Sequence, residues 1–138
     1  MENAKCPVIF VIDRNPIHSS LIKYHLNINR FLSVQVFRSG EEYLSRLHKN
    51  IFSDFLISDF DIGDMDGFEL MEKAIEKAPE TRIIFFSSND DSTLAIRLLE
   101  AGATDYILKT SKLDIGIGEM IKNVKYLCQE ANQAKKIY

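Results

Sequence analysis

Four polar residues follow four apolar stretches of the chain, and their types form a chemically specific set. The stretches end at Asp13, Asp59, Ser87 and Lys109. A carboxylate can act as a nucleophile toward a phosphoryl group. The oxygens of that group need a metal ion, an ammonium or hydroxyl donors. This set therefore favours phosphoryl chemistry, with the two acids able to hold Mg²⁺ and with Lys109 and Ser87 available for the phosphoryl oxygens.

One of these carboxylates begins an acidic segment. Asp59, Asp61, Asp64 and Asp66 lie within eight residues. Four carboxylates at this spacing repel one another, so a cation or a well-solvated loop is expected to be part of the site.

Apolar runs and helical periodicity alternate along the chain and predict the elements that position these residues. Strands are expected over 8–12, 32–37, 55–57, 82–86 and 106–108, and helices over 16–29, from 39, 67–78, from 91 or 92, and from 113 to about 134. This alternation predicts an α/β fold, a five-stranded parallel sheet of order 2-1-3-4-5 with helices on both faces. The carboxyl ends of such strands share one edge, so the four polar side chains should converge there.

The helix ends carry recognisable signals. Asn15-Pro16 and Asp66 suit helix starts, and Ser39 with Glu42 forms a predicted capping box. Gly102 is suited to follow a helix end. Six residues of the first helix recur at helical spacing, namely Ile17, Leu21, Ile22, Tyr24, His25 and Ile28. The third helix is expected to turn Phe68, Leu70, Met71, Ala74 and Ile75 inward, and Gly116 and Gly118 weaken the start of the last helix.

Length and composition limit the protein class. The 138 residues, 46% apolar and 27% charged, predict a single domain with a core over about 7–130 and a polar tail or linker start over 131–138. The net charge of −3 gives no support for nucleic-acid binding, and no membrane or signal segment is expected. Cys6 and Cys128 are expected to be reduced thiols of a cytoplasmic protein. His18, His25 and His48 are expected to face solvent rather than act as ligands.

Four motifs together resemble the receiver domain of bacterial two-component response regulators (CheY-like), over roughly residues 7 to 130. They are the segments 11–16, 58–70, 86–88 and 101–109, which include Asp13, Asp59, Ser87 and Lys109. The resemblance implies two-component phosphorelay signal transduction, a phosphoprotein that carries an aspartyl phosphate, and a sensor histidine kinase or phosphotransfer protein as partner. It implies no enzyme activity beyond self-phosphorylation from a donor and self-dephosphorylation, and a homodimer through helix 4, strand 5 and helix 5.

The resemblance also implies residue roles. Asp59 matches the phospho-acceptor, Lys109 the lysine that pairs with the phosphoryl group, and Ser87 the switch hydroxyl. Tyr106 matches the aromatic switch position. Asp13, Asp59 and the backbone carbonyl of Asp61 match Mg²⁺ ligands, and Asp61 and Asn89 match positions that modulate loss of the phosphoryl group.

Three departures from the family pattern bear on the site. Arg14 stands where the family has a second acid, which makes the local charge more positive by two units. A unit-charge contact at about 4 Å is worth roughly 4 kcal/mol at an effective dielectric near 20, so Mg²⁺ binding is expected to be weakened. Gly63 replaces a proline, which predicts a looser acidic loop. Thr110 replaces the proline after Lys109, which predicts a different aim for that lysine.

Two alternatives stay open at this point. In the first, the chain is a phosphorylation-independent interaction module, a pseudo-receiver in which Arg14 replaces the metal and Asp13 pairs with Arg14 or Lys109. The remote alternative is a haloacid-dehalogenase-type phosphohydrolase, because Asp59-Phe60-Asp61 resembles its DxD motif. That family places the motif on an early strand and needs more chain for its later motifs.

Overall fold

The computed structural model describes residues 6–137, and side chains to residue 131. Its strands are β1 (Ile9–Ile12), β2 (Val34–Phe37), β3 (Phe55–Ser58), β4 (Arg82–Ser87) and β5 (Asp105–Leu108), all parallel in the order β2-β1-β3-β4-β5. Its helices are α1 (Pro16–Ile28), α2 (Gly40–His48), α3 (Gly67–Lys77), α4 (Ser92–Glu100) and α5 (Leu113–Ile137). The predicted α/β class, strand order and alternation are confirmed.

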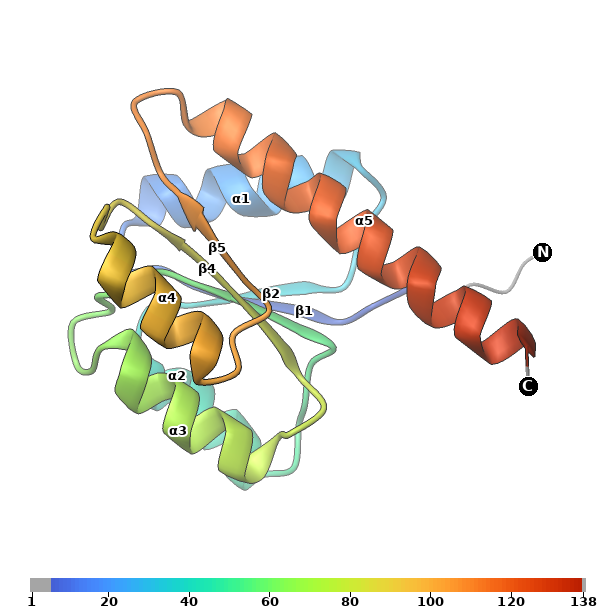
Figure 1. The fold of residues 1–138 in the computed structure, drawn as a ribbon, viewed down its shortest axis with the longest axis horizontal. Helices are drawn as coiled ribbons and strands as arrows, with labels where there is room; N and C mark the ends of the chain where they lie inside the picture. The colour runs from blue at the N-terminus through green and yellow to red at the C-terminus, as the bar shows by residue number, and fades with distance from the viewer. Residues whose placement is uncertain (1–5, 138) are drawn as a thin grey trace.

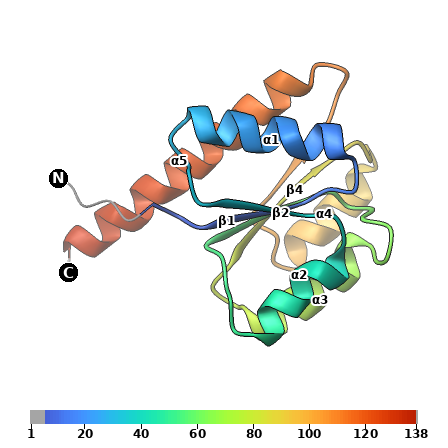
Figure 2. The same cartoon turned by 180° about the vertical axis from the view of Figure 1, so that it is seen from behind.

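The helices cover the sheet unequally on its two faces. Figures 1 and 2 show α1 and α5 on one face and α2, α3 and α4 on the other. Each face has its own apolar cluster: Ile22 and Met120 pack on the first, and Leu70 and Leu98 on the second. Burial on both faces explains why β1 and β3 are apolar throughout apart from Ser58. No helix among the described residues is long and apolar enough to cross a membrane.

The strand register brings the ends of the central strands level. Ile12 pairs with Ser58, so Asp13 and Asp59 follow side by side at the same edge. Ser87 pairs with Leu108, which places Lys109 next to it at that edge. The backbone N–H of Lys109 donates to the Ser87 carbonyl at 2.7 Å. The sheet therefore delivers all four polar residues to one rim.

The helix starts follow the predicted capping chemistry. The side chains of Asn15, Ser39, Asp66 and Asp91 each accept hydrogen bonds from backbone N–H groups in the first turn of α1, α2, α3 and α4. Glu42 departs from the predicted capping box, because its carboxylate accepts from the N–H of Arg38, one residue before the cap.

The apolar residues of α1 and α3 are not all buried, and one predicted apolar face is partly wrong. The buried face of α1 consists of Ser19, Ile22 and Leu26. Four of the residues that recur at helical spacing are exposed and form a stripe along α1, which we call the α1 stripe: Ile17, Leu21, Tyr24 and Ile28. In α3, Ile75 is 40% exposed rather than turned inward. Helical spacing identifies a shared face but does not say whether that face meets the sheet or solvent.

Candidate functional site

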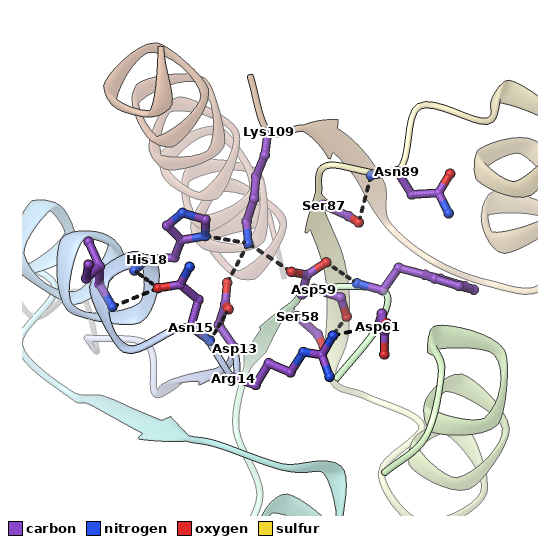
Figure 3. A network of polar contacts seen from close by, with 12 residues as sticks. Asp13, Arg14, Asn15, His18, Ser58, Asp59, Asp61, Ser87, Asn89 and Lys109 are labelled. Atoms are coloured by element: carbon purple, nitrogen blue, oxygen red, sulfur yellow. Dashed lines mark hydrogen bonds and ion pairs between the residues drawn. The ribbon is translucent and has the colours of Figure 1, made fainter. Parts of the chain in front are cut away.

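The four rim residues line one open cavity of about 540 Å³ at the carboxyl ends of the strands. The cavity is also lined by Arg14, Asp61 and Asn89, all expected at the site, and by His18, which was not. Figure 3 shows the side chains of His18, Lys109, Asp13 and Asp59 meeting between α1 and the β4–α4 loop, whereas the side chain of Asn89 points away from them. The structure thus brings together every predicted site residue except Tyr106, which does not line the cavity and donates from its phenol to the backbone carbonyl of Asn89.

Lys109 is the centre of the site. Its ammonium lies 2.6 Å from Oδ2 of Asp13 and 2.9 Å from Oδ2 of Asp59 (Figure 3). The lysine side chain is only 4% exposed. A buried ammonium needs compensating charge, and two carboxylates provide it. Lys109 is thus aimed at Asp59 although Thr110 replaces the proline that follows it in the family pattern.

The two carboxylates that share Lys109 differ in access. Asp13 is 2% exposed, and its other oxygen accepts the N–H of Asn15 at 2.9 Å. Asp59 is 17% exposed, and its Oδ1 accepts the N–H of Phe60 at 2.7 Å. Asp59 is thus the carboxylate that an incoming group can reach, while Asp13 is enclosed and anchors the lysine.

Arg14 contacts the acidic loop at the outer edge of the cavity. Its guanidinium lies 3.3 Å from Oδ2 of Asp61, and both side chains are more than half exposed. Such an exposed pair contributes little to stability, about 0–1 kcal/mol. The pair matters for its position, because Arg14 places a positive charge against the carboxylate of Asp61, where a metal ion is expected nearby. Arg14 is therefore an exposed side chain that is also paired with a carboxylate of the acidic loop.

The residues present do not fit a bound Mg²⁺ well. The ion prefers free carboxylate oxygens and keeps several waters. Here Asp13 and Asp59 are already bound by Lys109, and the Arg14 guanidinium lies against the carboxylate of Asp61, the residue whose backbone carbonyl is expected to bind the ion. Within the described part of the chain, no three His, Cys, Asp or Glu side chains are grouped to hold a metal ion. The expectation that Arg14 weakens Mg²⁺ binding stays a prediction.

The β4–α4 loop links the cavity to β5 through hydrogen bonds. The hydroxyl of Ser87 accepts the N–H of Asn89 at 3.2 Å. The phenol of Tyr106 donates to the backbone carbonyl of Asn89, and its ring packs at a 30° tilt against Phe85. Burial raises the pKa of Tyr106, and the neighbouring Ser87 hydroxyl acts in the opposite direction. The half-buried ring is therefore tied to the same loop as Ser87.

The acidic loop is held in place by Asp64 and Ile62. The two carboxylate oxygens of Asp64 accept the N–H groups of Gly40 and Glu41 at the start of α2, at 3.0 and 2.9 Å. Partial burial raises the pKa of Asp64, but these two hydrogen bonds outweigh it and the pKa lies below its usual value. The buried side chain of Ile62 also holds the loop against the core. These contacts offset the freedom that Gly63 was expected to introduce.

His18 is the site residue that sequence reasoning missed. Its Nδ1 lies 3.1 Å from the Lys109 ammonium, and the ring is half-buried rather than solvent-facing. The two residues are 91 positions apart, so no local pattern links them. The available signal was the position of His18 in the first turn after Asn15, directly beside the predicted rim.

Comparison with known proteins gives consistent relatives. Residues 9–122 match the model of the response regulator receiver domain. The sensory transduction protein LytR of Staphylococcus haemolyticus is 28% identical over 92% of this chain. The two-component response regulator ORR5 of Oryza sativa subsp. japonica is 29% identical over 79% of it. The chain spans 48% of the length of LytR and 82% of ORR5.

Solved structures share the fold. The CheY-like response regulator receiver domain protein from Methanospirillum hungatei JF-1 has a TM-score of 0.78 at 23% identity, covering 91% of this chain and 96% of its own. The response regulator domain of Thermotoga maritima CheB has a TM-score of 0.76 at 19% identity, covering 88% and 95%. At these identities the likeness concerns the fold alone. Together with the match over residues 9–122, it establishes that the chain belongs to the response regulator receiver domain family.

Proposed function

We propose that the chain is a signalling switch in which Asp59 accepts a phosphoryl group from a sensor histidine kinase or a phosphotransfer protein. One observation carries the proposal: the Lys109 ammonium lies 2.9 Å from Asp59 in an open cavity while Asp13 holds it from behind at 2.6 Å. Receiver domains are generally non-enzymatic signalling domains, so the chain would at most catalyse its own phosphorylation and dephosphorylation.

The chemistry is a displacement at phosphorus. An oxygen of Asp59 attacks the phosphorus of the donor, the new P–O bond forms, and the bond from phosphorus to the donor breaks with its electron pair leaving on the donor. The transferred oxygens carry negative charge, so Lys109 and the hydroxyl of Ser87 would donate to them. Receiver domains generally bind Mg²⁺ for this step, but the donor set here fits that ion poorly. The groups that would donate to the transferred oxygens are therefore Lys109 and Ser87.

The phosphoryl group would act by shifting a pre-existing equilibrium. Ser87 turned toward the phosphoryl group would give up the N–H of Asn89, and Tyr106 is bonded to the same residue. α4 is held to the core chiefly by Leu98. The loop, α4 and β5 therefore form a surface that a change at Ser87 can rearrange.

Two exposed apolar surfaces suit protein partners. The α1 stripe starts beside the cavity and supports docking of the phosphoryl donor. Ile96, Leu99, Leu108 and Ile115 are exposed on α4, β5 and α5 and support a homodimer through that face. We assign the chain to the cytoplasm, where such partners act, without direct contact to nucleic acid.

A second candidate is a pseudo-receiver that binds partners without phosphorylation. The contact of Arg14 with Asp61 at 3.3 Å favours it, because a cation already neutralises the acidic loop. In that case Asp59 would stay an unmodified partner of Lys109.

Intact-mass measurement after incubation with acetyl phosphate, with and without Mg²⁺, separates the two. We expect a mass gain of one phosphoryl group in the parent chain and none in Asp59→Asn. Asp61→Asn is a matched control that keeps the gain. If the parent stays unmodified under both conditions, the pseudo-receiver is the correct function.

A further inference from the structure

The ammonium of Lys109 has a third neighbour that the proposed function does not use. Besides Asp13 and Asp59, it contacts Nδ1 of His18 at 3.1 Å (Figure 3). An ammonium carries three N–H donors and no acceptor. Because the Lys109 side chain is only 4% exposed, each donor needs a partner within the protein, and these three atoms supply all of them.

The contact fixes the tautomer of the histidine. Since Lys109 can only donate, Nδ1 of His18 must be the unprotonated, accepting nitrogen, and the ring proton must be on Nε2. His18 therefore acts on the lysine as a neutral acceptor.

We propose that His18 is a positioning residue that holds the Lys109 ammonium toward the accessible oxygen of Asp59. The part of this inference that concerns phosphorylation rests on the proposed function, whereas the part that concerns the lysine does not. Asp59 and Asp13 attract the ammonium by charge, but charge alone does not fix its direction. The neutral third acceptor on α1 completes the arrangement.

The local backbone makes this placement rigid. Asn15 accepts the N–H groups of Ile17 and His18 at 3.0 and 3.3 Å, so His18 sits in a capped first turn. The N–H of Asn15 in turn donates to Asp13, which also binds Lys109. Asp13, Asn15, His18 and Lys109 thus form a closed ring of contacts, and each residue limits the movement of the next.

Removal of the His18 acceptor leaves one N–H of a buried ammonium without a protein partner. Lys109 is a flexible side chain with four methylene groups. It would then admit water or settle between the two carboxylates, so the N–H that points to Asp59 would no longer be held in the direction of an incoming phosphoryl group. Hydrogen bonds to charged groups are strong enough that loss of one slows a step that depends on it by about tenfold.

The first test follows the lysine itself and needs no phosphorylation. NMR measures the exchange of the Lys109 ammonium protons with water, with Lys109→Met to assign the signal. We expect His18→Leu to speed this exchange by about tenfold, because the third acceptor is gone. His18→Asn places an amide oxygen near the position of Nδ1 and should restore slow exchange. His25→Leu, on the same helix and also half-buried, is the matched control and should leave exchange unchanged. Equal exchange in the parent, His18→Leu and His18→Asn would overturn the proposal.

The second test follows the rate of Asp59 phosphorylation by acetyl phosphate. We expect His18→Leu to be slower by about tenfold and His18→Asn to stay within about twofold of the parent. Leucine is a strong helix former, so the fold should survive, and circular dichroism checks it. An unchanged rate in His18→Leu would overturn the role in phosphorylation. If the parent itself takes up no phosphoryl group, the proposed function fails, and the exchange measurement still decides whether His18 positions Lys109.

Discussion

The two aspartates that contact Lys109 differ in burial, and therefore in the role that each can have. Asp13 has both oxygens occupied, by Asn15 and by Lys109, and is 2% exposed. Asp59 is 17% exposed and faces the cavity. Two carboxylates beside one ammonium leave one net negative charge, which an incoming phosphoryl group would increase. Phosphorylation of Asp59 therefore depends on the cations at the rim as much as on the nucleophile.

Arg14 leads to a prediction about metal affinity. Arg14→Asp removes a guanidinium 3.3 Å from Asp61 and adds a carboxylate at the same edge. Two units of charge favour a divalent cation, so we expect Mg²⁺ to bind at least about tenfold more tightly than in the parent. Isothermal titration calorimetry with Mg²⁺ measures the change.

Arg38→Asp is the matched control for that titration, because it makes the same charge change outside the cavity lining. It should leave Mg²⁺ affinity near that of the parent. Equal affinity for the parent and Arg14→Asp would mean that Arg14 does not govern the metal position.

At the scale of elements, α5 offers a direct test of packing. A Cβ on Gly118 would meet nothing within 4 Å, whereas a Cβ on Gly116 would lie 2.9 Å from the Phe86 ring. Gly118→Ala should therefore raise the free energy of unfolding by about 1 kcal/mol through helix propensity. Gly116→Ala gains the same propensity but crowds a buried ring, so it should be neutral or destabilising by about 1 kcal/mol. Urea denaturation compares the two, and equal stabilisation would contradict the packing described.

The elements show what the sequence could predict. Local signals were sufficient for the strands, for the caps at Asn15, Ser39 and Asp66, and for the left-handed Gly102 after α4, because each depends on neighbours within a few positions. The sheet order followed from alternation and crossover handedness.

Contacts between distant elements were not predictable in the same way. The capping of α2 by Asp64 spans 23 and 24 residues, and the contact of His18 with Lys109 spans 91. Both depend on how helices and loops pack around the sheet. The buried face of α1 was not predictable for a related reason, since Ser19, a polar residue, lies on it and its hydroxyl donates to the Pro16 carbonyl at 3.2 Å. The resemblance to the receiver family placed Asp59 and Lys109 at one phosphoryl site, whereas the contact of Arg14 with Asp61 spans 47 residues and lies outside the family pattern.

At the scale of the whole molecule, a buried phenol and a partly buried thiol make the free energy of unfolding depend on pH in the alkaline range. Tyr43 is fully buried, its hydroxyl has no hydrogen-bond partner among the described residues, and burial raises its pKa well above the usual value. Burial also raises the pKa of Cys128. The folded state holds the phenol and thiol protons more tightly than the unfolded chain does. Their contribution to the free energy of unfolding is therefore present at neutral pH. It falls as the pH rises past the pKa values of the unfolded chain, about 8.5 for cysteine and about 10 for tyrosine.

Tyr43→Phe tests this dependence. The variant removes a buried hydroxyl that has no partner, so it should be as stable as the parent at pH 7 or more stable by about 1 kcal/mol. Its free energy of unfolding should also fall less steeply above about pH 10. Urea denaturation over a pH series measures both effects. Tyr24→Phe, at an exposed position of α1, is the control. Parallel curves for the parent and Tyr43→Phe would contradict the assignment.

One measurement tests the central claim most directly. The claim is that the rim of the sheet forms a phosphoryl-accepting pocket whose nucleophile is Asp59. Borohydride reduces an aspartyl phosphate to homoserine, which marks the modified residue in a peptide map. After treatment with acetyl phosphate and then borohydride, we predict homoserine at position 59 in the parent chain. Homoserine at position 13 or 61 instead, or an unchanged Asp59, would contradict the account.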